Sequence, residues 1–179
     1  LSLANPVVAG YAAYAFANEA DVRVNCRLAA DAVGATKMDR PEWCSTHPST
    51  GEVYFACTNN SNRRLAPTGT QSIVDAANPR SYTDTRGAAT QQGNVNGHIV
   101  RLKEGTGHAA ATSFTWDIYL FGAETGASAD LVNLSGLTAE QDFSSPDGLW
   151  FSSKTGICWI QTDDGAYTDV TNCMMMAGL

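Results

Sequence analysis

Arg40 and Glu42 flank Pro41 just ahead of a predicted hairpin, and both side chains are of types that bind ligands. Pro41 lacks a backbone donor and favours an extended Arg40, so we expect both side chains at the start of a strand. Two residues apart on an extended segment, they would point the same way, about 6–7 Å apart. Glu42 could bind a hard cation while Arg40 donates hydrogen bonds to an oxyanion such as phosphate. A plain salt bridge between them is the alternative.

The same pattern returns later in the chain. Pro146 and Asp147 follow Pro41 and Glu42 at a spacing of 105 residues, without a gap through the hairpin turn. An aspartate before a glycine is often only a turn residue. Because it repeats the position of Glu42, we predict Asp147 as a second metal ligand facing the same cavity.

Further polar residues stand at the hairpin ends. Asn59, Asn60 and Asp163 carry oxygens that suit calcium, which takes roughly six to eight oxygen ligands. Ordinary turn chemistry at the end of a strand is the alternative for these residues. His98 begins the middle hairpin and is a further candidate for lining the site. For Asp39 we expect a local cap or turn contact.

Other catalytic patterns are missing from the sequence. The three histidines have no zinc-site spacing, and no Gly-x-Ser-x-Gly elbow or phosphate-binding loop occurs. Covalent serine chemistry therefore has no support from the sequence.

Three β-hairpins must position these residues, near 43–58, 97–121 and 149–163. Both faces of these strands carry apolar residues, which is typical of sheets packed on both sides. Units of about 40–50 residues are typical of β-propeller blades. We therefore predict a mainly β chain in which 1–179 belongs to one propeller domain. Three blades do not close a ring of roughly four to eight, so we expect the remaining blades elsewhere in a longer polypeptide.

An alanine-rich lead-in precedes the hairpins. Its composition predicts a helical segment over 6–34, with helices near 6–18 and 20–33 and Gly34 as the C-cap. Two long connections, 59–96 and 122–145, separate the hairpins, and the second could hold a short helix near 138–142. The stretch after Asp164 has no clear period.

Composition limits the classes of partner. The 179 residues are 44% apolar and carry a formal net charge of −7. This acidic balance, without a basic cluster, argues against a general nucleic-acid binder or an anionic-membrane binder. No run approaches the roughly 18 apolar residues of a membrane helix. The five cysteines form no CxxC pair, and we expect most of them to be small buried apolar residues.

Seven stretches, in order along the chain, closely resemble the PhoX-type alkaline phosphatases, which are exported bacterial phosphomonoesterases. They are Gly34-Ala-Thr-Lys-Met-Asp-Arg-Pro-Glu-Trp43, Gly51-Glu-Val-Tyr54, Thr58-Asn-Asn-Ser61, Ala76-Ala-Asn-Pro-Arg80, Asn96-Gly-His-Ile99, Phe114-Thr-Trp-Asp117 and Ser145-Pro-Asp-Gly-Leu149.

The resemblance implies metal-dependent hydrolysis of phosphate monoesters by a periplasmic or secreted enzyme. It further implies a six-bladed propeller whose channel holds calcium and iron around a bound phosphate. In that arrangement Glu42 is a metal ligand and Arg40 a phosphate contact. The family's cysteine ligand to iron lies in a segment outside this chain, so none of the five cysteines is expected to take that role.

Two other functions compete with this interpretation. The chain could be a non-catalytic propeller segment that binds structural calcium. It could also belong to a metal-dependent lactonase-type propeller, because acids at the starts of inner strands suit that chemistry too. Arg40 favours phosphate over a lactone.

Overall fold

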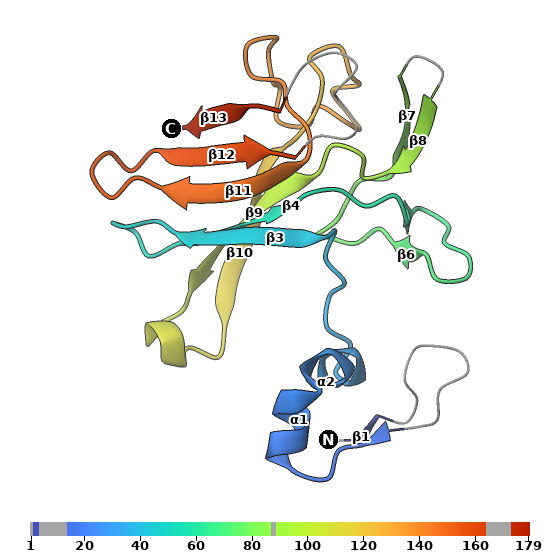
Figure 1. Ribbon diagram of the computed structural model, residues 1–179, viewed down its shortest axis with the longest axis vertical. Helices are drawn as coiled ribbons and strands as arrows, with labels where there is room; N and C mark the ends of the chain where they lie inside the picture. The colour runs from blue at the N-terminus through green and yellow to red at the C-terminus, as the bar shows by residue number, and fades with distance from the viewer. Residues whose placement is uncertain (1, 4–13, 87–88, 164–172) are drawn as a thin grey trace. The chain divides into compact units, whose positions relative to one another are not determined.

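The computed structural model of this chain describes residues 2–3, 14–86, 89–163 and 173–179, which fall in two compact units, Leu1–Lys37 and Met38–Leu179. The described residues are mainly β with few helices, as predicted (Figure 1).

The first unit holds two short strands and two short helices. The strands β1 (Ser2–Leu3) and β2 (Tyr14–Ala15) pair antiparallel, and α1 (Glu19–Val24) and α2 (Cys26–Ala32) follow. Asn18 starts α1, because its extended backbone lets its side chain accept a hydrogen bond from the Asp21 amide.

The predicted lead-in is confirmed only in its second half. Gly34, with φ of 66°, follows α2 as expected of a C-cap glycine, and the predicted second helix is divided at Asn25. The first predicted helix is wrong at residues 14–15, which form β2, and its residues 6–13 lie outside the described residues. Alanine has the highest helix propensity, but propensity is overridden by tertiary contacts. Here β2 pairs with β1, and the hydroxyl of Tyr14 donates to Asp21 at 2.6 Å.

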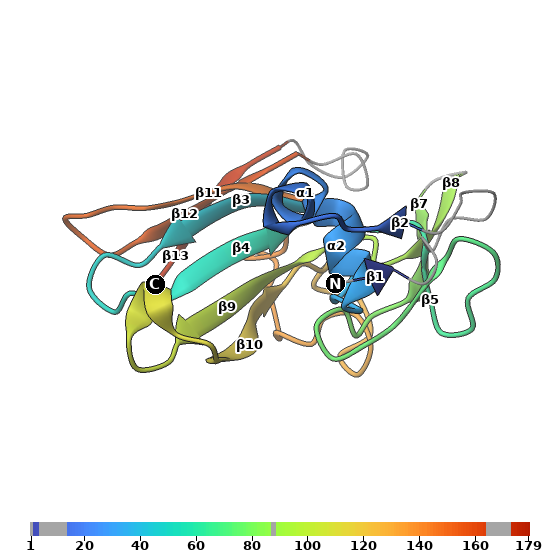
Figure 2. The same ribbon diagram turned by 90° about the horizontal axis from the view of Figure 1, so that it is seen from below.

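The second unit is built on two antiparallel sheets. The first has the order β10-β9-β4-β3, and the second has the order β11-β12-β13 (Figures 1 and 2). The strands of the first are β3 (Pro41–Thr46), β4 (Val53–Cys57), β9 (His98–Glu104) and β10 (Phe114–Phe121). Those of the second are β11 (Pro146–Phe151), β12 (Cys158–Thr162) and β13 (Met175–Gly178).

The three predicted hairpins are present, but they are not three separate sheets. Strand β4 pairs with β9, so the first two hairpins form one four-stranded sheet, with Val53 opposite Leu102 and Cys57 opposite His98. The expectation that each hairpin belongs to its own blade is therefore wrong for the first two hairpins, which share one sheet. Strand β13, which the sequence did not predict, is the third strand of the second sheet.

The 105-residue repeat is confirmed in three dimensions. Cys44 pairs with Phe55 and Leu149 with Ile160, so the two hairpins have the same register. Both turns contain a glycine in the left-handed region, Gly51 at φ 71° and Gly156 at φ 74°.

An apolar core lies between the two sheets. Its buried members from the first sheet are Tyr54 and Ile99, and those from the second are Leu149, Phe151, Cys158 and Ile160. The Tyr54 and Phe151 rings meet edge to face with centroids 4.9 Å apart, a favoured geometry for aromatic pairs. Strand β11 packs against both β3 and β4, so the two predicted acid-bearing strand starts are neighbours in the fold.

The two long connections are ordered around a second core. The first carries the parallel pair β5 (Arg63–Arg64) and β6 (Ser72–Ile73), then the antiparallel pair β7 (Tyr82–Arg86) and β8 (Ala89–Gly93). A 3-10 helix, η1 (His108–Ala110), lies between β9 and β10. The predicted helix near 138–142 is wrong, because this segment forms a turn in which the Gln141 amide bonds the Thr138 carbonyl. Phe143 beyond it is fully buried in the second core.

Gly97 permits a close approach of backbone at the start of β9. Its φ is 67°, and a Cβ there would meet the carbonyl oxygen of Thr58 well inside van der Waals contact. We expect Gly97→Ala to lower the free energy of unfolding by about 2–4 kcal/mol, from left-handed strain plus steric clash. Gly69→Ala is the matched control, since its φ is 60° and nothing lies within 4 Å, and it should cost only about 1 kcal/mol. Urea unfolding measures the loss of stability in both variants. Equal losses would exclude a steric clash at Gly97 as a cause of destabilisation.

Candidate functional site

The residues before the two prolines, Arg40 and Ser145, hold an unusual backbone conformation. Their φ values are 50° and 54°, and the Arg40 carbonyl accepts from Thr58 N at 3.2 Å as the Ser145 carbonyl accepts from Asp163 N at 3.0 Å. The prediction of an extended Arg40 is therefore wrong. Left-handed conformations of this kind cost about 1–3 kcal/mol and tend to occur at functional sites.

A β-bulge places each predicted acid at the start of its strand. The register shifts between Pro41 and Cys44, and again at the equivalent place after Pro146. Glu42 and Asp147 both lie inside these bulges. Bulges bend a strand and redirect its side chains, so the simple alternation assumed from the sequence does not apply to either acid.

The guanidinium of Arg40 lies on the surface beside two acceptors. Its Nη2 is 3.8 Å from Glu42 Oε1, and its Nη1 donates to Asn59 Oδ1 at 3.0 Å. The side chains of Arg40 and Glu42 are 60% and 36% exposed. An ion pair this long and this exposed contributes little to stability, which leaves both charged groups available to a ligand.

Asp147 and Asp163 line a common hollow of about 560 Å³. Strands β3, β11 and β12 and the segment before β13 form its walls, and Trp43, Gly148, Gln161, Thr162, Cys173, Met174 and Met175 complete its lining. Glu42 is not among the lining residues, although its neighbour Trp43 is. The structure therefore brings the two aspartates together and places Glu42 with Arg40 and Asn59.

Asn59 and Asn60 have different environments. Asn59 joins the two strand starts, because it accepts from Arg40 and its Nδ2 donates to Ser145 Oγ at 3.2 Å. Asn60 turns inward, and its Nδ2 donates to the buried Asp39 carboxylate at 2.7 Å.

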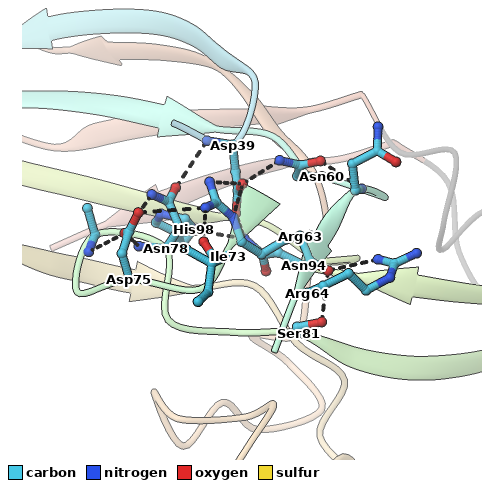
Figure 3. A network of polar contacts seen from close by, with 12 residues as sticks. Asp39, Asn60, Arg63, Arg64, Ile73, Asp75, Asn78, Ser81, Asn94 and His98 are labelled. Atoms are coloured by element: carbon cyan, nitrogen blue, oxygen red, sulfur yellow. Dashed lines mark hydrogen bonds and ion pairs between the residues drawn. The ribbon is translucent and has the colours of Figure 1, made fainter. Parts of the chain in front are cut away.

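A buried polar network around Asp39, the residue before Arg40, was not predicted from the sequence (Figure 3). Asp39 is fully buried and accepts from Arg63 Nη2 at 2.8 Å and from Asn94 Nδ2 at 3.0 Å. The Asp39 amide in turn donates to Asn78 Oδ1 at 3.1 Å. The expectation of a local cap or turn contact for Asp39 is therefore wrong. Anchoring Asp39 inward fixes the point from which Arg40 emerges.

Arg80 extends this network toward the second core. It is fully buried, and its guanidinium donates to Asn94 Oδ1 at 2.9 Å and to the carbonyls of Gly122 and Val132 at 2.8 and 2.6 Å. The guanidinium also lies over the Phe121 ring, 4.7 Å from its centroid. Burial lowers the pKa of Arg80. Arg80 ties the segment around 94–97 to the long connection after β10.

His98 is fully buried in the same network. Its role as a residue that lines the functional site stays a prediction. Asn94 Nδ2 lies 2.9 Å from His98 Nδ1, and because an amide NH₂ only donates, Nδ1 is the acceptor of a neutral ring. Burial, followed by the positive charge of Arg80, lowers the pKa of His98 to about 4. The ring is therefore neutral at pH 7.

This shift predicts a loss of stability in mild acid. Between pH about 6.5 and 4 the unfolded chain binds a proton on His98 that the folded chain does not. The contribution of the neutral His98 ring to the free energy of unfolding is fully present above pH 6.5. It should fall by about 3 kcal/mol as the pH drops to 4. The charges of Asp39 and Arg63 also act on this ring, and both residues are unchanged in the variant used below. Urea titrations at several pH values give the free energy of unfolding of wild type and His98→Gln. Between pH 6.5 and 4 this free energy should fall less steeply with decreasing pH in the variant, and an equal dependence on pH would contradict the prediction.

Two of the cysteines behave as predicted. Cys57 and Cys158 are buried, and burial raises their pKa values to about 12 and about 11, so both stay protonated thiols at neutral pH. Cys26, Cys44 and Cys173 are exposed, so the expectation that most cysteines are buried is wrong.

The donors at the strand starts are mostly hard oxygens, which suit calcium. Asp147, Asp163, Gln161 and Thr162 offer such oxygens in the hollow. Over the described residues, no group of three or more His, Cys, Asp or Glu side chains could hold a metal ion. No helix among the described residues has the length and apolar character needed to cross a membrane.

Comparison with known proteins identifies the family of this chain. Residues 4–178 match the family Alkaline phosphatase PhoX. The chain is also similar to the solved structure of Pseudomonas fluorescens PhoX in complex with vanadate, a transition state analogue, at 33% identity and a TM-score of 0.72. That similarity covers 91% of this chain and 27% of the other, so this chain spans about a quarter of its length. No curated protein matches. The chain belongs to the alkaline phosphatase PhoX family, as its motifs predicted.

Proposed function

We propose that this chain forms part of the phosphate and metal site of a metal-dependent phosphomonoesterase. The family match over residues 4–178 supports this, as does the 33% identity to a relative solved with vanadate. The observation that carries the proposal is the Arg40–Glu42 pair, which projects an exposed guanidinium and an exposed carboxylate from one bulged strand start.

Each residue has a distinct role in the proposal. Arg40 donates hydrogen bonds to phosphate oxygens and stabilises them as charge redistributes in the transition state. Glu42 and Asp147 bind cations, calcium being the best match to carboxylate oxygens, with Asn59, Asn60, His98 and Asp163 as weaker candidates for lining the site. Bound metal ions, calcium and iron in this proposal, would neutralise phosphate oxygens and activate an oxygen nucleophile.

We also propose that the two sheets are neighbouring blades of a propeller. Tyr54 of the first sheet is 5% exposed beneath the second sheet, whereas its repeat equivalent Trp159 is 36% exposed. Trp150, opposite Trp159 on β11, is 64% exposed. In a propeller, each sheet covers the same face of its neighbour, as the second sheet here covers Tyr54 of the first. The equivalent face of the second sheet carries Trp150 and Trp159, and we propose that a further blade of the same polypeptide packs on it.

A paired assay tests the function. The complete gene product should hydrolyse phosphate monoesters and not lactones, lose activity when calcium is chelated, and recover it on calcium addition. The isolated 179-residue chain should show little or no hydrolysis, because it corresponds to 27% of the length of the solved relative. Hydrolysis of lactones alone would favour the lactonase-type function, and calcium binding without hydrolysis by either polypeptide would favour a structural role. A periplasmic or secreted location, also proposed, is testable by fractionation.

A further inference from the structure

We infer that Asn59 is a positioning residue that orients the Arg40 guanidinium relative to the start of β11. The inference rests on the proposed function, because it concerns how Arg40 meets phosphate. It differs from a role as a cation ligand, in which the Asn59 side-chain oxygen would face the metal rather than Arg40.

The segment 58–59 joins the two equivalent strand starts. On the first side, Thr58 N donates to the Arg40 carbonyl at 3.2 Å and Asn59 Oδ1 accepts from Arg40 Nη1 at 3.0 Å. On the second side, Thr58 Oγ1 donates to the Pro146 carbonyl at 2.9 Å and Asn59 Nδ2 donates to Ser145 Oγ at 3.2 Å. Both ends of the Asn59 amide are therefore used, one on each sheet. Because Arg40 and Ser145 are repeat equivalents, this amide spans matching positions of the two sheets.

Arg40 needs such a partner because little else holds it. Its side chain is 60% exposed, and its contact with Glu42 is long at 3.8 Å. A free arginine side chain samples many rotamers, and fixing it in advance reduces the ordering required when a ligand binds. A neutral amide does this without cancelling the positive charge, whereas a second carboxylate would compete with phosphate. With one N–H given to Asn59, the other donors of the guanidinium fork remain for a ligand.

The test is a double-mutant cycle in the complete gene product. Asn59→Ala should raise the KM for a phosphate monoester, and the inhibition constant of inorganic phosphate, roughly tenfold. Arg40→Ala should raise both by more. In the Arg40→Ala background, Asn59→Ala should add almost nothing, because its effect passes through Arg40. Asn62→Ala is the control, an exposed asparagine three residues along the same loop that should leave both constants unchanged.

The possible outcomes distinguish failure of the positioning role of Asn59 from failure of the proposed phosphate site. If Arg40→Ala leaves both constants unchanged, the proposed phosphate site is wrong. If Arg40→Ala has its effect but Asn59→Ala has none, or the two losses add in full, the positioning role is wrong while the site stands. Ser145→Ala provides a second variant should Asn59→Ala fold poorly. It removes the far anchor of the amide, together with the contact of the same hydroxyl with Ser144 Oγ at 3.2 Å. It should give a smaller increase in the same constants that again disappears in the Arg40→Ala background.

Discussion

Replacing Glu42 by Gln in the complete gene product should reduce phosphomonoester hydrolysis about 100-fold or more and lower the bound calcium. The substitution keeps the size of the side chain and one oxygen but removes the negative charge that a divalent cation requires. Preorganised charge at the reacting group is often the largest single contribution to catalysis, and metal ions supply much of it for phosphate esters. Steady-state rates together with elemental analysis of the purified variant measure both effects.

Glu52 provides the matched control for this substitution. It lies on the same hairpin at the turn end, where its Oε2 accepts from Thr50 Oγ1 at 3.1 Å. Glu52→Gln removes the same charge from the turn of the same hairpin and should leave rate and metal content near the wild-type values. Near-normal activity in Glu42→Gln, or equal losses in both variants, would remove Glu42 from the mechanism.

The sequence revealed the features that depend on neighbours along the chain. The turn glycines, Gly51 and Gly156, and the recurrence of proline and acid at 105 residues predicted both acid-bearing hairpins and their common register. Local rules suffice there, because turn conformation and short-range alternation determine a hairpin.

The same rules failed where one extra residue enters a strand. A bulge between Pro41 and Cys44 breaks the alternation, so the faces assigned to Glu42 and its neighbours did not follow from counting. The left-handed Arg40 was missed for a related reason. Its conformation is imposed by the burial of Asp39 and by the bond from Thr58, neither of which is local in sequence.

Pairing between distant segments was not predictable from one sequence. The contact of β4 with β9 joins strands separated by the long first connection, and spacing alone does not tell whether two hairpins pair edge to edge or stack face to face. The polar network is a stronger case. Asp39, Arg63, Asn78 and Asn94 come from separate segments of the chain with no shared period, and each one alone resembles a surface residue.

Asp39→Asn should be the most destabilising single substitution in this network, lowering the free energy of unfolding by about 3–5 kcal/mol. Arg63 is 1% exposed and Asp39 is fully buried, so the variant removes the nearest counter-charge of a buried guanidinium and leaves the longer contact with the half-exposed Asp75, 3.6 Å away. Asp117→Asn is the matched control: it breaks the Arg101–Asp117 pair, whose side chains are 36% and 51% exposed, and should cost about 0–1 kcal/mol. Urea unfolding of both variants gives the comparison. A loss for Asp39→Asn no greater than that for Asp117→Asn would mean that Arg63 finds water or another acceptor when the carboxylate is gone, and that this ion pair does not hold Arg40 at the strand start.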